Sequence, residues 1–133
     1  MGEENPNKNP RIIVIQKLYT YFLNKESEIS YPKHRYKKFI KDTVSGTIER
    51  EELLLGNLKE ILQDEFNPSR TDLILKLMIL SATFELMFSH KTPINVIVSE
   101  YVKISDFFLE TAHKGYLNAI LDKVSKKVRK DHE

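Results

Sequence analysis

The chain has 133 residues, a net charge of +2 at pH 7 and no cysteine. This length suits one domain with a core of its own, and the absence of cysteine excludes disulfides and thiolate metal sites. Even the apolar run from Leu77 to Leu80 is far shorter than the roughly 20 residues that a membrane-spanning helix needs. The first residues show no basic-then-apolar signal pattern, so we expect a soluble, cytoplasmic protein without a membrane partner.

The first half of the chain has the spacing of three helices. Residues 1–8 lack apolar periodicity and should be disordered. Asn9 and Pro10 give a cap and first-turn signal for a helix over about residues 10–24. Pro32 is expected to open a second helix, whose apolar stripe runs through Gly46 without changing phase. A new stripe after Glu52 predicts the third helix.

A turn at Asn67 and Pro68 separates this half, about residues 9–66, from a second half over about residues 67–130. The segment from Thr71 to Phe88 is apolar on nearly every face, which predicts a buried central helix.

Two amphipathic helices follow. Thr92 is expected to cap the first of them, with Pro93 at its first position, and a corner at Glu110 to His113 leads into the second. Arg129 falls with the lysines on the basic face of that last helix. Because no strand-like alternation or repeat occurs, the sequence predicts an all-α fold of six or seven helices in two subdomains, with residues 9–133 forming a single domain.

No enzyme motif is present. The chain has no G-x-S-x-G, Walker, G-x-G-x-x-G or H-E-x-x-H pattern, and its four histidines are scattered. We therefore expect no catalytic residues, no metal site and no cofactor. Two stretches are basic and contain no acidic residue, one from Lys33 to Lys41 and one from Lys123 to Lys130. Each can be an ordinary solvated helix face or a phosphate-binding patch.

Three motifs of the chain together carry a family resemblance. The segment from Pro93 to Asp122 has the pattern P-x-x-V-x-V-x-E-x-V-x-I, ten further residues, and G-Y-L-N-A-I-L-D. Upstream are "SATFEL" at 81–86 and "RIIVIQKLY" at 11–19. The three motifs resemble helices of the NusB family of bacterial antitermination factors. The resemblance covers nearly the whole chain and implies a NusB-like helical bundle.

The resemblance also implies RNA contacts at two places. One is the start of the first helix, where Lys8 and Arg11 stand in a region that is arginine-rich in the family. The other is the corner before the last helix, with Lys114, Tyr116 and Asn118. An exposed aromatic beside a lysine can stack an unpaired base while the cation meets phosphate, although an aromatic at a helix start is more often part of the core.

A partner surface for ribosomal protein NusE is implied at Tyr19, Phe84 and Glu85. The alternative for Glu85, a charge on an apolar helix turn, is an internal salt bridge. The implied function is non-enzymatic: binding of single-stranded boxA RNA in ribosomal-RNA leaders together with NusE, within the RNA polymerase antitermination complex. Two alternatives remain open. One is a stand-alone relative of the RNA-binding domain of ribosomal-RNA cytosine methyltransferases, and the other is a helical interaction protein that has lost RNA binding.

Overall fold

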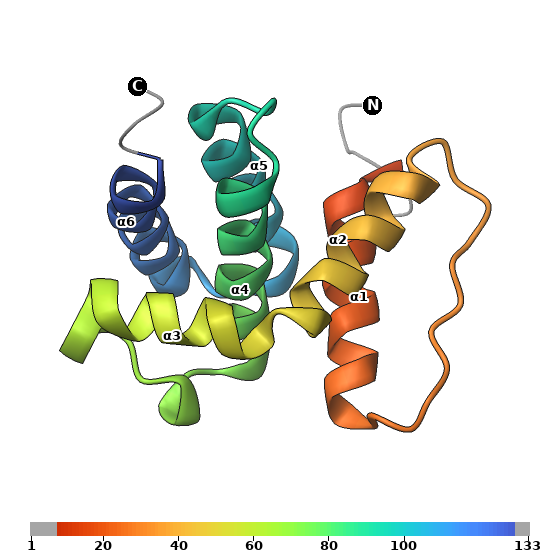
Figure 1. Ribbon diagram of the computed structural model, residues 1–133, viewed down its shortest axis with the longest axis horizontal. Helices are drawn as coiled ribbons and strands as arrows, with labels where there is room; N and C mark the ends of the chain where they lie inside the picture. The colour runs from red at the N-terminus through yellow and green to blue at the C-terminus, as the bar shows by residue number, and fades with distance from the viewer. Residues whose placement is uncertain (1–7, 130–133) are drawn as a thin grey trace.

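A computed structural model describes residues 8–129, and over this range the chain forms six α-helices and two short 3-10 helices with no strand (Figure 1). The predicted all-α fold is confirmed. The predicted disordered segment 1–8 lies outside the described residues except for Lys8, and so do residues 130–133. The elements are α1 (Pro10–Leu23), α2 (Lys37–Glu49), α3 (Glu51–Leu62), η2 (Gln63–Glu65), η3 (Pro68–Arg70), α4 (Leu73–Phe88), α5 (Ile94–Phe108) and α6 (Thr111–Val128).

Helix α1 starts where its cap signal predicts. The side-chain oxygen of Asn9 accepts hydrogen bonds from the backbone N–H groups of Arg11, at 3.0 Å, and Ile12, at 3.4 Å. Pro10 occupies the first turn, where its missing N–H leaves no partner unsatisfied. The first turn is therefore held in place by the sequence next to it.

Helix α2 begins at Lys37, so the prediction that Pro32 opens it was wrong. A turn comes first: Nδ1 of His34 accepts from the N–H of Tyr36 at 2.9 Å, and the His34 carbonyl accepts from the N–H of Lys37 at 3.1 Å. The proline signal marks the approach to this turn, and helical hydrogen bonding starts only after it.

Gly46 lies inside α2, as its unbroken stripe predicts. A Cβ added there would lie 2.2 Å from Cζ of Phe84 on α4, well inside van der Waals contact. The glycine therefore makes room for an aromatic ring of the neighbouring helix, which offsets its unfavourable helix propensity.

Helix α4 is the centre of the molecule. Its side chains from Leu77 to Leu86 are buried, and it contacts each of the other five helices. Figure 1 shows α4 and α5 between the α1–α2 pair and α6, with α3 crossing below α4 and α6. The sequence boundary at Asn67 and Pro68 coincides with η3, between α3 and α4.

The last two helices differ from prediction at their starts. Pro93 is the N-cap of α5, and no capping hydrogen bond from the Thr92 side chain is formed. The corner is only Leu109 and Glu110, because α6 already begins at Thr111. These helices nevertheless lie side by side, as their two stripes require.

Arg129 is buried, so its placement on the basic surface of the last helix was wrong. Its guanidinium donates to four backbone carbonyl oxygens at and beyond the end of α4, at 2.6 to 3.2 Å. Burial lowers the pKa of this arginine. The carbonyls at a helix C-terminus lack intrahelical partners and attract a cation, so Arg129 caps α4 from the end of α6.

Candidate nucleic-acid interface

The first turn of α1 is anchored in the core by a buried ion pair. The Arg11 guanidinium donates to both carboxylate oxygens of Glu85 on α4, at 2.6 and 2.9 Å. The Tyr101 hydroxyl of α5 donates to the same carboxylate at 2.5 Å and lies 2.6 Å from the Ser81 hydroxyl. Three helices therefore meet at a single carboxylate.

The electrostatics of this cluster keep Arg11 charged and Tyr101 neutral. Burial raises the pKa of Tyr101 well above its ordinary value, and the negative charge of Glu85 acts in the same direction. Burial opposes the charge on Arg11, but its hydrogen bond and ion pair with Glu85 outweigh that effect and raise its pKa. A neutral tyrosine thus donates to a carboxylate that a cation neutralises.

This geometry corrects two of the predicted partner residues. Glu85 has no exposed surface and Phe84 is buried against Gly46, so neither side chain offers itself to NusE at the surface. The internal salt bridge, the alternative for Glu85, is what the structure shows. Tyr19 is different: its side chain is 37% exposed on α1. The three residues do not form one surface.

Arg11 is also committed to the fold. Besides Glu85, its guanidinium carbon lies 4.9 Å from the ring centre of Phe39 and 5.7 Å from that of Tyr101. This guanidinium lies near two rings and donates to a buried carboxylate through Nε and one Nη, so most of its contacts are made within the fold. The prediction of Arg11 as an RNA contact is therefore not supported by its position.

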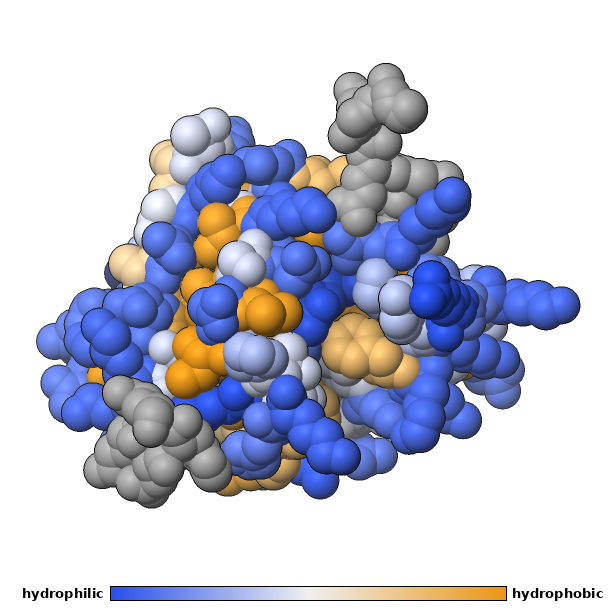
Figure 2. Space-filling view, turned by 90° about the horizontal axis from the view of Figure 1, so that it is seen from above, coloured by the Kyte–Doolittle hydropathy of each residue, from blue (hydrophilic) through white to orange (hydrophobic). Residues whose placement is uncertain are grey.

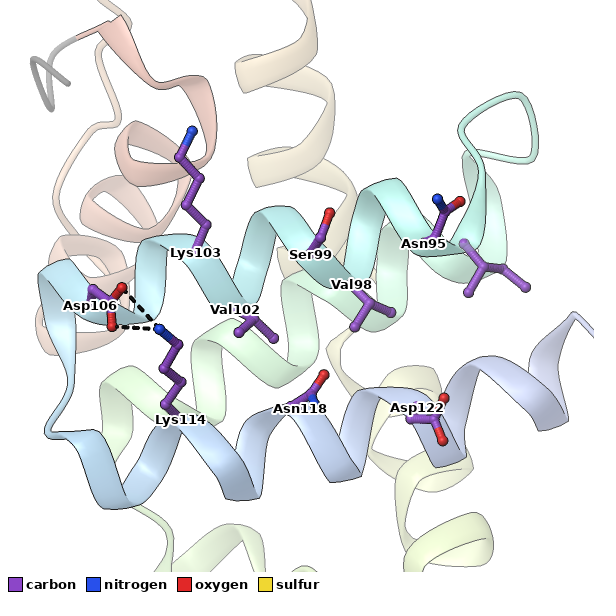
Figure 3. A pocket seen from close by; sticks show the side chains of 10 residues that line it. Asn95, Val98, Ser99, Val102, Lys103, Asp106, Lys114, Asn118 and Asp122 are labelled. Carbon is purple, nitrogen blue, oxygen red and sulfur yellow. Dashed lines mark hydrogen bonds and ion pairs between the residues drawn. The ribbon is translucent and has the colours of Figure 1, made fainter. Parts of the chain in front are cut away.

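Lys114 and Asn118 line a groove of about 590 Å³ between α5 and α6 (Figure 3). The Lys114 ammonium lies 3.0 Å from both carboxylate oxygens of Asp106, which joins the two helices across one end of the groove. The Asn118 side chain is exposed and makes no hydrogen bond to any other described residue. Val98 and Val102 form part of its apolar floor. The groove offers an amide and apolar surface, together with a lysine whose charge is shared with Asp106.

Tyr116 does not join this groove. Its ring packs against the core, and its hydroxyl donates to the Glu65 carbonyl at 2.7 Å. Burial raises its pKa, with the charge of Glu65 as a second cause. The predicted grouping of Tyr116 with Lys114 and Asn118 was therefore wrong, because helical spacing turns it to another face of α6.

Lys8, the remaining predicted RNA contact, is exposed beside the turn that precedes α2. It lines a hollow of about 430 Å³ together with Lys33, His34, Arg35 and Tyr36. The sequence showed each of these parts, but nothing in its local pattern placed Lys8 against residues 33–36. In the other basic stretch, Lys123 pairs with Glu65, and Lys126 pairs with Asp122 at 3.1 Å.

Neither a metal site nor a membrane span is found in the described part of the chain. Within residues 8–129 no three His, Asp or Glu side chains gather as metal ligands would. None of the helices there is both long and apolar enough to cross a bilayer. On the face of the molecule seen in Figure 2, hydrophobic side chains form a few patches among mostly hydrophilic ones.

Comparison with known proteins agrees with the sequence resemblance. The chain is 31% identical over 107 residues to "Transcription antitermination protein NusB" of Mesorhizobium japonicum, covering 80% of this chain and 69% of the relative. It is 33% identical over 91 residues to the protein of the same name from Sinorhizobium fredii, covering 68% of this chain but only 57% of the relative. The match thus spans little more than half of that relative's length.

The fold has a solved counterpart. A crystal structure of NusB from T. maritima superposes with a TM-score of 0.80 at 19% identity, covering 97% of each chain. At this identity the likeness concerns the fold alone. The sequence model of the NusB family matches residues 8–126, from the first described residue to the last turns of α6. The chain belongs to the NusB family.

Proposed function

We propose that this chain is a transcription antitermination factor that binds single-stranded boxA-type RNA of ribosomal-RNA leaders together with NusE. It acts in the cytoplasm as a non-enzymatic part of the RNA polymerase antitermination complex. Family membership supports the antitermination role, because the relatives carry that name.

The observation that carries the RNA part is the placement of polar and basic side chains on either side of α5. Helix α1 packs on one side of α5, with Lys8 just before its first turn, and α6 packs on the other, with Lys114 and Asn118 in the groove. Single-stranded RNA is recognised by cations that meet phosphate and by amides that read base edges. Side chains of these two kinds flank one helix here.

The proposed NusE contact centres on the exposed edge of α1. Tyr19 is 37% exposed there, and Leu23 in the last turn is also exposed. An exposed aromatic beside an aliphatic side chain is typical of a protein interface. This edge lies at the opposite end of α1 from Lys8, which leaves room for RNA and protein at the same time.

The proposal is tested by fluorescence anisotropy with a labelled boxA-type RNA and a scrambled strand of equal composition, each with and without NusE. We expect tighter binding of the boxA strand and a further gain with NusE. Asn118→Ala should reduce the preference for boxA, because an amide reads base edges. Lys8→Gln should weaken both strands alike and lower the slope of log K against log salt by about 0.7.

Lys59 in the last turn of α3 provides the matched control, because it is an exposed lysine that lines neither the α5–α6 groove nor the hollow beside Lys8. Lys59→Gln should leave both affinities and the salt slope unchanged. Equal affinity for boxA and scrambled RNA, with and without NusE, would refute the proposed function. If the chain binds NusE but binds neither RNA strand, it would instead be assigned to the alternative of a helical interaction protein.

A further inference from the structure

The turn before α2 and the start of α2 form a strongly basic region of the described chain. Residues 33–41 hold four lysines, an arginine and a histidine with no acid. Among the described residues, only Lys38 of this stretch has an acidic partner, Asp42, at 2.7 Å. The side of the molecule that carries α1 and α2 is predominantly hydrophilic in Figure 2. Lys33, Arg35 and Lys37 are thus cations with no carboxylate to neutralise them in this part of the structure.

An exposed aromatic ring stands in the middle of these cations. Tyr36 is 46% exposed, and its ring centre is 6.0 Å from that of His34. The guanidinium carbon of Arg35 lies 5.4 Å from the ring centre of Tyr36. The hydrogen bonds from Tyr36 and Lys37 to His34 fix the turn, so the ring is presented by an ordered backbone. Core packing does not account for an aromatic at this position.

Lys8 joins this cluster across the hollow of about 430 Å³. That volume falls within the roughly 300–1,000 Å³ of small-ligand sites. A flat ring surrounded by unneutralised cations fits a ligand with flat bases and regularly spaced negative charges. A peptide with acidic side chains would satisfy the cations and leave the ring without a partner.

We propose that Lys8, Lys33, Arg35, Tyr36 and Lys37 form a second contact site for single-stranded RNA, here named the turn site. Tyr36 stacks one unpaired base, and the cations around it contact the adjoining phosphates. The inference rests on the proposed function for its ligand class. It adds a site outside the α5–α6 groove, in which Lys8 is joined by four residues of the basic stretch that starts at Lys33. The turn site supplies cations at the end of α1 where Arg11 is consumed by Glu85.

The test measures binding of oligouridylate of about ten nucleotides, a length within the usual single-strand site sizes. Tyr36→Ala should weaken binding about tenfold or more, whereas Tyr36→Phe should keep it, because stacking needs the ring and not the hydroxyl. Lys33→Gln with Lys37→Gln should lower the salt slope by about 1.4, two phosphates at about 0.7 each. Lys59→Gln again serves as the charge control. Thermal melts check that each variant is folded. We expect wild-type melting temperatures because all the substituted side chains are exposed.

Each outcome decides the matter. Wild-type affinity in Tyr36→Ala would overturn the turn site, and so would equal losses in Tyr36→Ala and Tyr36→Phe. Failure of the wild-type chain to bind any single strand would overturn it as well. The proposed function fails by a different observation, equal affinity for boxA and scrambled strands. A chain that loses oligouridylate affinity in Tyr36→Ala but shows no boxA preference would keep the turn site and refute the proposed function.

Discussion

The Arg11–Glu85 pair predicts a large loss of stability in Glu85→Ala. The substitution removes three hydrogen bonds at one carboxylate and leaves the Arg11 cation, whose side chain is 11% exposed, without its counter-charge. Removing one partner of a buried ion pair costs about 3–5 kcal/mol. Because domains are stable by only about 5–15 kcal/mol, that is a large share of the free energy of unfolding. For a chain of this size, about 3–4 °C per kcal/mol gives a melting temperature lower by about 10–20 °C.

The assay combines thermal melting with calorimetric titration of NusE at a temperature where the variant is folded. Asp42→Ala is the matched control, because its pair with Lys38 is solvent-exposed and contributes little. We expect a large drop in melting temperature for Glu85→Ala, almost none for Asp42→Ala, and unchanged NusE affinity in both. A Glu85→Ala melt no lower than that of Asp42→Ala, with NusE binding weakened tenfold, would refute the buried pair and return Glu85 to the partner surface.

Three further perturbations probe the packing. Gly46→Ala should lower the free energy of unfolding by about 1–3 kcal/mol because its Cβ would meet the Phe84 ring, whereas Gly56→Ala, with no atom within 4 Å, should raise it by up to about 1 kcal/mol; urea unfolding compares them. Arg129→Ala should cost about 2–4 kcal/mol by the same assay, and Arg129→Lys should recover only part, because one ammonium cannot replace a guanidinium on four carbonyls. Because folding raises the pKa of Tyr101, this tyrosine contributes fully to the free energy of unfolding below its unfolded-state pKa of about 10. That contribution is lost as pH rises through the folded-state pKa, so stability should fall more steeply above about pH 10 in the wild type than in Tyr101→Phe.

The sequence predicted the elements that depend on neighbours along the chain. Helical stripes and the Asn9 cap are local signals, and they placed α1 and the buried α4 within two residues of their observed starts. The start of α2 was missed because Pro32 is compatible with a first helical turn and with an extended approach to a turn. The hydrogen bonds that His34 accepts select the turn over the helical start. The spacing of apolar residues carries no information about these hydrogen bonds.

Contacts between distant segments were beyond the sequence pattern. Arg129 follows lysines in the sequence, so its pattern predicts one more surface cation. It is nevertheless buried, because its guanidinium donates to backbone carbonyls at the end of α4. Tyr116 reads as an exposed aromatic at a corner, but its hydroxyl meets Glu65 from a segment 51 residues earlier. In both cases the residue type fits two environments, and only the packing of α6 on the rest of the fold selects one.

Arg11 shows the same ambiguity with a functional consequence. The resemblance placed it among RNA-binding residues, whereas in space its guanidinium neutralises Glu85, a partner 74 residues along the chain. A guanidinium that neutralises a buried carboxylate can offer a phosphate only the N–H groups that the carboxylate leaves free. Cations near the start of α1 that no carboxylate of the described chain neutralises are therefore the better candidates for a phosphate contact, and Lys8 and the basic turn before α2 supply such cations. If RNA binding in this chain depends on the turn site, then Glu85→Ala and Tyr36→Ala separate the two roles that sequence alone assigns to one end of α1: the first lowers stability, and the second lowers RNA affinity.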